Sequence, residues 1–557
     1  MRPAFTSLRL AAATAVLLVG LTAPAAATDT LALEGTLSDD GRALDLSWPP
    51  ARNAKATVMR RPFGSAGPES WRTIQPSELT GFSMRDDTLE PGQAYEYRIE
   101  LIQPGREALP KIWSGSWVAG RDVPGQLREG MALLIVDETI ADAIEDPLAT
   151  FAKDLTGAGW AVVRHDVPRH DAEDAAQNLR QASDLRQWIT DQYDAADGPR
   201  TAVILVGHVP IVLTGLQVPD GHDPHAVPSD LYYADPTGLW PTTQSPDGVP
   251  QLLPSQLPAP IPMQIGRIDF ANLDPAFGDE TTLLAAYLDR NHRWRHAQMG
   301  ERRLAYGDDP NLRVEINALN NIVGKENVRT AGHDDSGDQP YLMGIDFGEW
   351  NGSTYAGLPP SHAIFAINFG SGKHRFDGGN NPMTALLAQP GDVLAVGWGG
   401  RPAWQLHGMA LNESIGEAHL RTVNNGISAA GRVPPDYPAM GNYDWDRPPW
   451  VNLLGDPTLR PFPMAPVSDL SAMRQDAGVT LTWTEPEDAE GTMVLRAPDM
   501  GGPWQAMNGG NLVRGSFTDT DPHAGAVYLV RAAGLAQVHA GSVHRLAQGV
   551  FIEIPAR

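Results

Sequence analysis

Three polar side chains that could act together in catalysis lie in one glycine-rich stretch. Ser371 stands between two glycines, and His374 and Asp377 follow it closely. A hydroxyl, an imidazole and a carboxylate are the groups of a serine hydrolase, in which the imidazole takes the hydroxyl proton. The G-x-S-x-G elbow is incomplete, because Phe369 occupies the position of its first glycine. A serine nucleophile is therefore one interpretation, and the other is that Ser371 is a small residue in a tight turn.

A second glycine-containing loop combines aromatic rings with a guanidinium group. Trp398, Arg401 and Trp404 surround two glycines at the end of an apolar run. Indole faces can stack on a ligand, and an arginine can hold a carboxylate with two hydrogen bonds. These three residues are candidates for a binding cleft. The alternative is that the tryptophans pack beneath the loop while Arg401 pairs with an acid.

A third loop has the side chains of a metal site. His222 and His225 are three residues apart, and Asp230 and Asp235 follow. Imidazoles and carboxylates are ligands for zinc, and carboxylates with other oxygens hold calcium. A divalent metal, calcium or zinc, is the cofactor that this loop could bind. The HxxH pattern is common, so a polar loop without a metal remains the other interpretation.

Apolar runs of the strand type position these loops. Residues 131–137, 160–164 and 201–207 are continuous apolar segments, and helical periodicity separates them. This alternation predicts a doubly wound, mostly parallel α/β sheet with helices on both faces. In such a sheet, ligands and catalytic groups gather at the carboxyl ends of the strands. The runs that end in glycines at 370 and 399 predict two strands opening into the loops described above.

Several phrases in the middle of the chain resemble the gingipain-type secreted cysteine peptidases, which have a caspase-like α/β fold. The similarity is carried, in order, by VILVGHVPIV (203–212), SDLYYADPTGLWP (229–241), IPMQIGRI (261–268) and LLGDPTLRPF (453–462). His208 stands where that family usually has aspartate. Members often bind calcium through acidic loops, which for this chain would favour Asp230 and Asp235 as ligands.

The resemblance stops at the catalytic dyad of that family. There, one strand ends in G-H-G and the next ends in the nucleophilic cysteine; here the two places read Gly370-Ser371-Gly372 and Val396-Gly397-Trp398. A serine cannot serve as the base at neutral pH, and glycine has no side chain. The chain contains no cysteine at all. Thiol-dependent peptidase chemistry is excluded, and Ser371 and His374 remain as residues of the former dyad loop.

Two similar β-rich segments flank the middle of the chain. LDLSW (44–48) and VTLTW (479–483) alternate in the same way, and YEYR (95–98) parallels YLVR (528–531). Alternation of this kind, broken by Pro and Gly turns, predicts small sandwiches. Both resemble fibronectin type III domains. We expect modules at 28–121 and 466–557 on either side of an α/β domain at 128–463.

The N-terminal residues and the net charge limit the possible functions. A basic start, an apolar run at 10–21 and Ala25 to Ala27 predict a signal peptide over 1–27, hence a secreted or periplasmic protein. No later run is long enough for a membrane span. The net charge of −25 argues against a nucleic-acid partner.

Three functions are consistent with these observations. The first is a pseudoenzyme that binds an extracellular peptide, protein or glycan in the former active cleft. The second is a hydrolase with a rebuilt site, either metal-dependent at the His222 loop or based on Ser371. The third is a structural or adhesion protein that acts through its β modules.

Overall fold

A computed structural model describes most of the chain. The described residues are 28–79, 81–104, 110–217, 225–244, 250–252, 260–310, 312–345, 355, 357, 359–370, 372–399, 403–427, 437, 451–475 and 478–554. The predicted signal peptide lies outside them, as do Ser371, Arg401 and His222. Among the described helices, none is long and apolar enough to cross a membrane.

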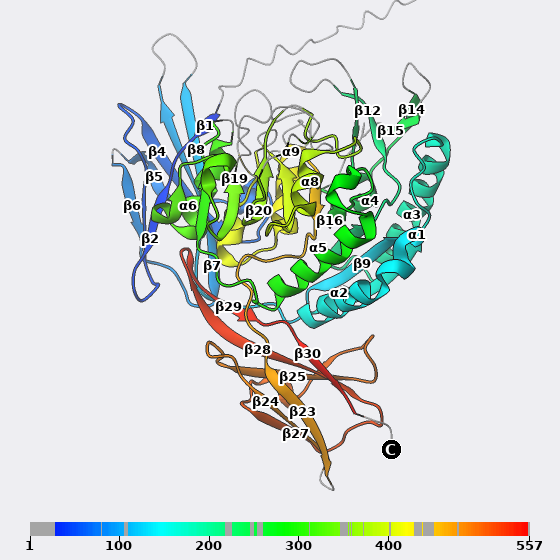
Figure 1. Ribbon diagram of the computed structural model, residues 1–557. Helices are drawn as coiled ribbons and strands as arrows, with labels where there is room; N and C mark the ends of the chain where they lie inside the picture. The colour runs from blue at the N-terminus through cyan, green and yellow to red at the C-terminus, as the bar shows by residue number, and fades with distance from the viewer. Residues whose placement is uncertain are drawn as a thin grey trace, which may run out of the picture.

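A ten-stranded, mostly parallel sheet forms the centre of the molecule (Figure 1). Its order is β10 (Trp160–Val167), β9 (Gly130–Asp137), β11 (Thr201–Val206), β16 (Met263–Ile268), β22 (Leu453–Gly455), β21 (Ala395–Trp398), β20 (Ala363–Asn368), β19 (Tyr341–Ile345), β17 (Leu304–Gly307) and β18 (Val328–Arg329). The short β22 is antiparallel to β21. Every residue of β11, β16 and β20 is buried, which requires cover on both faces of the sheet. The predicted doubly wound α/β architecture is confirmed.

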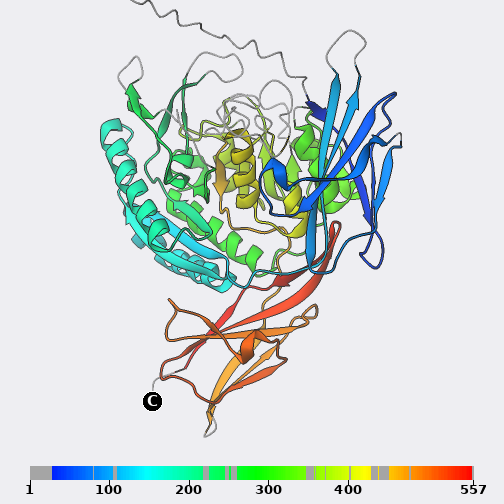
Figure 2. The same ribbon diagram turned by 180° about the vertical axis from the view of Figure 1, so that it is seen from behind.

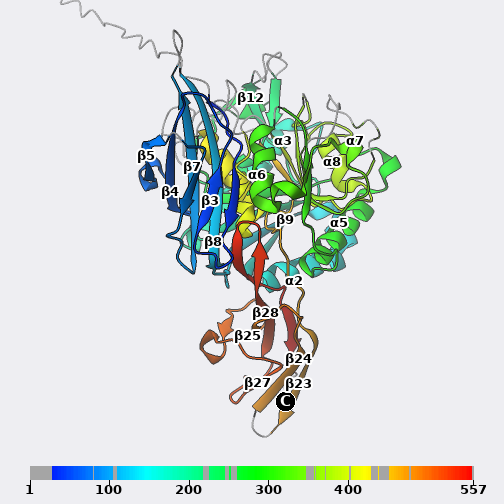
Figure 3. The same cartoon turned by 90° about the vertical axis from the view of Figure 1, so that its left-hand side faces the viewer.

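Helices cover this sheet on both sides (Figure 3). On one side α2 (Glu145–Ala158) packs on α5 (Glu280–Arg295), which also contacts α8 (Pro382–Ala388). Other helices are α3 (Ala175–Ala195), α4 (Leu231–Ala234), α6 (Arg313–Val323) and α9 (Ile415–Ile427), of which α4 and α9 contact β16. The left-handed residue that ends α2 is Gly159, with a φ of 106°.

The two flanking modules are β-sandwiches with one strand plan. In the first, β2 (Glu34–Leu37), β3 (Leu44–Ser47) and β6 (Ser83–Asp86) face a sheet of β4 (Lys55–Pro62), β5 (Arg72–Leu79), β7 (Gln93–Gln103) and β8 (Lys111–Val123). In the second, β23 (Ser468–Gln475), β24 (Gly478–Thr484) and β27 (Ser516–Asp519) face β25 (Gly491–Ala497), β26 (Gln505–Ala506), β28 (Val527–Val538), β29 (Gly541–Leu546) and β30 (Val550–Glu553). Equivalent bonds link Tyr97 to Asp86 at 2.8 Å and Tyr528 to Asp519 at 2.6 Å.

The two sandwiches are joined edge to edge. The β28–β29 hairpin of the C-terminal module reaches the N-terminal module, where β29 runs parallel to β8 (Figures 1 and 2). A single ten-stranded sheet therefore passes through both modules. The approach depends on Gly541, because a Cβ there would lie 1.7 Å from the carbonyl oxygen of Gly120. The modules bracket the α/β domain in sequence but meet beside it in space.

Candidate functional site

The two loops that resemble the peptidase dyad lie on adjoining strands. Asn368 of β20 pairs with Trp398 of β21, and the Trp398 indole donates to the carbonyl oxygen of Gly370 at 3.1 Å. The loop after β16 meets the loop after β20, since the Asn272 amide donates to the carbonyl oxygen of Asp377 at 3.2 Å. The carboxyl ends of β16, β20 and β21 therefore share one edge of the sheet. We call this the carboxyl edge.

At Gly397, the position that the sequence resemblance aligns with the peptidase nucleophile, the carboxyl edge has no room for a side chain. Gly397 lies directly under the indole of Trp404, and a Cβ on Gly397 would be 2.2 Å from Trp404 Cζ2. The ring is held there because its Nε1 donates to the carbonyl oxygen of Trp398 at 2.8 Å. A cysteine at this position would require the tryptophan to move.

The aromatic side chains of the predicted cleft are part of the core. Trp398 is 1% exposed and Trp404 is 0% exposed. This burial fits the interpretation in which the tryptophans pack in the interior of the domain. Neither indole offers a free face to a ligand in this conformation. Arg401 lies outside the described residues.

The loop that follows β20 is also closely packed. His374 is buried, and its ring lies edge-on to Trp398 with 5.1 Å between the centroids. Lys373 is buried beside it and donates to the Asn368 side chain at 3.0 Å and to the carbonyl oxygen of Phe369 at 2.6 Å. Asp377, which could have completed a triad, instead accepts two hydrogen bonds from Arg375. This part of the edge is filled by its own side chains.

A separate polar cluster occupies the other half of the carboxyl edge, beyond β11 and β16. The Nδ1 of His208 lies 2.8 Å from Asp269 Oδ2, so the carboxylate orients the imidazole. Burial alone would raise the pKa of Asp269, but the hydrogen bond from His208 and the charge of Arg267 hold it below its usual range. The ring of His170 stands perpendicular to that of His208, and burial lowers the pKa of His170 to about 4. The cluster thus contains one neutral imidazole and one imidazole oriented by a carboxylate.

The predicted metal-loop carboxylates have protein donors. Asp230 accepts from Arg267 at 2.9 and 2.7 Å. Asp235 accepts from the backbone of Gly238 at 2.7 Å and from the indole of Trp240 at 2.8 Å. His225 begins β13 (His225–Pro228), a strand of a small sheet with β12 (Leu213–Gln217), β15 (Pro250–Leu252) and β14 (Thr242–Gln244). A cation at Asp230 would therefore compete with a guanidinium already in place.

Three polar residues of this edge were not among the sequence candidates. They are Arg169, His170 and Asp269, each of which comes within three residues of a strand end. Arg169 donates to Asp137 at 2.6 Å and to Glu280 at 2.8 Å, and so joins the ends of two strands to the start of α5. In the sequence, only their position just after buried strands could have indicated these residues, because polar residues at such positions meet at one edge of the sheet.

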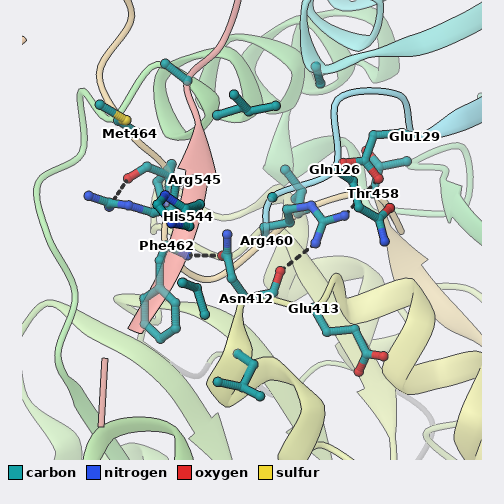
Figure 4. A pocket seen from close by; sticks show the side chains of 18 of the residues that line it. Gln126, Glu129, Asn412, Glu413, Thr458, Arg460, Phe462, Met464, His544 and Arg545 are labelled. Atoms are coloured by element: carbon teal, nitrogen blue, oxygen red, sulfur yellow. Dashed lines mark hydrogen bonds and ion pairs between the residues drawn. The ribbon is translucent and has the colours of Figure 1, made fainter. Parts of the chain in front are cut away.

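A cavity of about 370 Å³ lies where the α/β domain and both modules meet (Figure 4). Its charged lining is largely paired internally: Glu129 accepts from Arg200 at 2.6 Å and from Arg460 at 2.8 Å. Arg531 donates to the carbonyl oxygens of Ala547 and Leu127, and burial lowers its pKa to about 10. The lining residues come from all three parts of the chain, so the cavity lies at their junction, and its charges are already paired.

In the described part of the chain, one group of side chains could hold a metal ion: Asp154, His292 and His296. It lies on α2 and α5, away from the predicted metal loop.

Comparisons with known proteins show no family for this chain. Neither a protein-family profile nor a curated protein sequence matches the chain. A solved structure described as a protease is 12% identical over 75% of this chain and 97% of its own, with a TM-score of 0.44. A Fn3-like protein from Clostridium thermocellum is 22% identical over 17% of this chain and 95% of its own, with a TM-score of 0.13. The chicken CNTN1 FN1-FN3 domains are 10% identical over 95% of this chain and 99% of their own, also with a TM-score of 0.13.

Proposed function

We propose that this chain is a secreted or periplasmic, gingipain-like protein that is not a cysteine peptidase and that binds an extracellular peptide, protein or glycan. The observation that carries the proposal is the packing of Trp404 on Gly397, which fills the nucleophile position. The absence of cysteine from the whole chain agrees with it. The tryptophan packing is specific, since the indole is hydrogen-bonded to the same strand whose end it covers.

In this proposal the ligand contacts the carboxyl edge through its partly exposed arginines, Arg169 after β10 and Arg375 after β20. Trp398, Trp404 and His374 are withdrawn from solvent, whereas the side chains of Arg169 and Arg375 are about one-third exposed. Both guanidinium groups can donate to carboxylates or hydroxyls of a peptide or glycan. Arg169 is paired with Asp137 and Glu280, and Arg375 is paired with Asp377, which favours a ligand with mixed polar groups.

Restoring the thiol should not restore catalysis. We expect Gly397→Cys to lose about 1–3 kcal/mol of stability through overpacking, and to show no thiol-dependent cleavage of fluorogenic peptides. Gly379→Cys is the matched control, because it adds a thiol on the same edge where the nearest atom to a new Cβ is 3.9 Å away. Urea unfolding and an iodoacetamide-sensitive peptidase assay measure both effects. Cleavage by Gly397→Cys at unchanged stability would contradict the proposal.

Ligand binding should depend on the partly exposed arginines of the carboxyl edge. Fluorescein-labelled casein peptides and a glycan array test the two ligand classes on the full chain. We expect the wild type to bind one class, and Arg375→Ala to weaken that binding by roughly tenfold, since a charge-assisted hydrogen bond is worth about 1.5 kcal/mol or more. Arg164→Ala, which removes an arginine of β10 that is also about one-third exposed, should leave binding unchanged. Equal loss from the two variants would place the ligand elsewhere.

A hydrolase with a rebuilt site is the second candidate, and the His208–Asp269 pair favours it. An imidazole oriented by a carboxylate is the arrangement of a general base. The same casein peptides distinguish the two functions. Thiol-independent cleavage that His208→Gln abolishes would establish the hydrolase and overturn the binding role.

A further inference from the structure

The seam between α2 and α5 gathers three metal-ligating side chains. Asp154 projects from α2, while His292 and His296 lie one turn apart at the end of α5. The imidazole nitrogens approach the two oxygens of Asp154 separately: His292 Nδ1 lies 2.7 Å from Oδ2, and His296 Nε2 lies 3.0 Å from Oδ1. The centroids of the two imidazole rings are 4.0 Å apart. The three side chains thus surround one point from two helices.

This arrangement has two interpretations. Without a metal, the two oxygens of the carboxylate each accept a hydrogen bond from one imidazole. With a metal, the ion takes the place of the two shared protons, because the same two nitrogens and the carboxylate become its ligands. All the candidate ligand atoms lie within 4.8 Å of one another. A tetrahedral ion with bonds of about 2.0–2.1 Å needs its ligand atoms roughly 3.3 Å apart, so the imidazole nitrogens and the carboxylate must separate from their present contacts of 2.7 and 3.0 Å as the ion enters.

We propose that Asp154, His292 and His296 bind one divalent transition-metal ion of the zinc class. Two imidazoles on one helical face, at i and i+4, fix the nitrogen donors before the ion arrives. Nitrogen donors favour zinc and its neighbours over calcium or magnesium, which select oxygen. The three protein ligands leave a fourth position for water.

Access and burial also fit an ion. The side chain of Asp154 is only 6% exposed, whereas that of His292 is 31% exposed. An ion can therefore enter from the His292 side and meet a carboxylate that is largely shielded from water. Shielding strengthens the attraction between the carboxylate and a cation.

The bound ion would act as a clamp near a junction between domains. The backbone carbonyl of Asp154 accepts from the Gln548 side chain at 2.6 Å, and that of Gly157 accepts from the backbone of Gly549 at 3.1 Å. Both donors belong to the C-terminal module, between β29 and β30. Fixing α2 against α5 therefore also fixes the surface on which the C-terminal module is docked (Figure 1).

The test uses chelator-treated full-length protein and zinc chloride. Calorimetric titration should give one ion per chain, and saturating zinc should raise the midpoint of thermal unfolding. His292→Ala and His296→Ala should each weaken binding by at least about tenfold and reduce the thermal shift at the same zinc concentration. His292→Ala is the safer variant for folding, because its side chain is the most exposed of the three. His523→Ala removes an exposed histidine of the C-terminal module and should change neither quantity.

Three results would overturn the inference. The first is the absence of stoichiometric binding in a wild-type chain that is folded by circular dichroism. The second is binding that survives both alanine variants. The third is binding that is lost with His222→Ala or His225→Ala instead, which would assign the ion to the loop predicted from the sequence.

Discussion

Replacing Glu96 by glutamine should reduce the free energy of unfolding by about 3–5 kcal/mol, because it leaves the buried charge of Arg61 without its partner. Glu96 and Arg61 are both almost fully buried, and Arg61 Nε donates to Glu96 at 2.6 Å. On the other oxygen, Glu96 accepts from Tyr437 at 2.5 Å and from His407 at 2.6 Å. These last two residues belong to the α/β domain, so the carboxylate links that domain to the N-terminal module.

The effect should depend on pH in a defined direction. Burial alone would raise the pKa of Glu96, but His407 and Arg61 lower it to about 2. A depressed folded pKa means that the stabilisation is complete above the ordinary value near 4.5 and is lost as the pH falls towards 2. The difference between wild type and Glu96→Gln should therefore be large at pH 7 and shrink below pH 4.5. Urea unfolding across this range measures it.

A control variant at an exposed ion pair shows whether the loss of stability depends on the burial of the pair. Asp45 pairs with Arg85 in the same module, but both side chains are more than half exposed. Asp45→Asn should cost less than about 1 kcal/mol, since exposed pairs contribute little. If Glu96→Gln costs no more than Asp45→Asn at pH 7, the link between the domains does not depend on this carboxylate.

Most of the fold follows from local patterns. The segments at 131–137 and 201–207 are mostly apolar. Every residue of β11 is buried, which requires that both faces of the strand are covered. The repeat between the two modules was visible because the matching segments, LDLSW (44–48) and VTLTW (479–483), share the same alternation and end in tryptophan. What no local pattern indicates is the pairing of β29 with β8. Its Gly541 and Gly120 are more than four hundred residues apart, and the open edge of a strand looks the same in sequence whichever partner it finds.

The candidate site was predicted less completely, and for a physical reason. That the loops after β20 and β21 adjoin follows from the order of parallel strands. Whether Trp404 covers Gly397 or faces a ligand depends on three-dimensional packing, because an indole is suited to both environments. His208 and Asp269 meet across two neighbouring strands, and Asp154 meets His292 across two helices. The i, i+4 spacing of His292 and His296 was visible in the sequence, but their third partner was not.

The stability of the carboxyl edge should depend most strongly on Arg267. This side chain is completely buried and donates to both oxygens of Asp230, as well as to the carbonyl oxygen of Val209 at 2.8 Å. Arg267→Met should reduce the free energy of unfolding by about 3–5 kcal/mol, because Asp230 would keep a buried charge without a counterion. Arg293→Met, which breaks an exposed i, i+4 pair with Asp289, should cost about 0.5 kcal/mol or less. Urea unfolding compares the two variants.

A double variant distinguishes charge from shape at the same position. In Arg267→Met with Asp230→Leu, no charge is left unpaired, so much of the lost stability should return. The Arg267 guanidinium also lies 3.5 Å from Asp269, whose carboxylate orients His208. Removing the guanidinium takes away one of the influences that hold the pKa of Asp269 low, so the double variant should regain stability without regaining the native environment of His208. If the double variant is as unstable as Arg267→Met alone, then the methylene packing and backbone hydrogen bonds of Arg267 hold the edge together, and the charge pair does not.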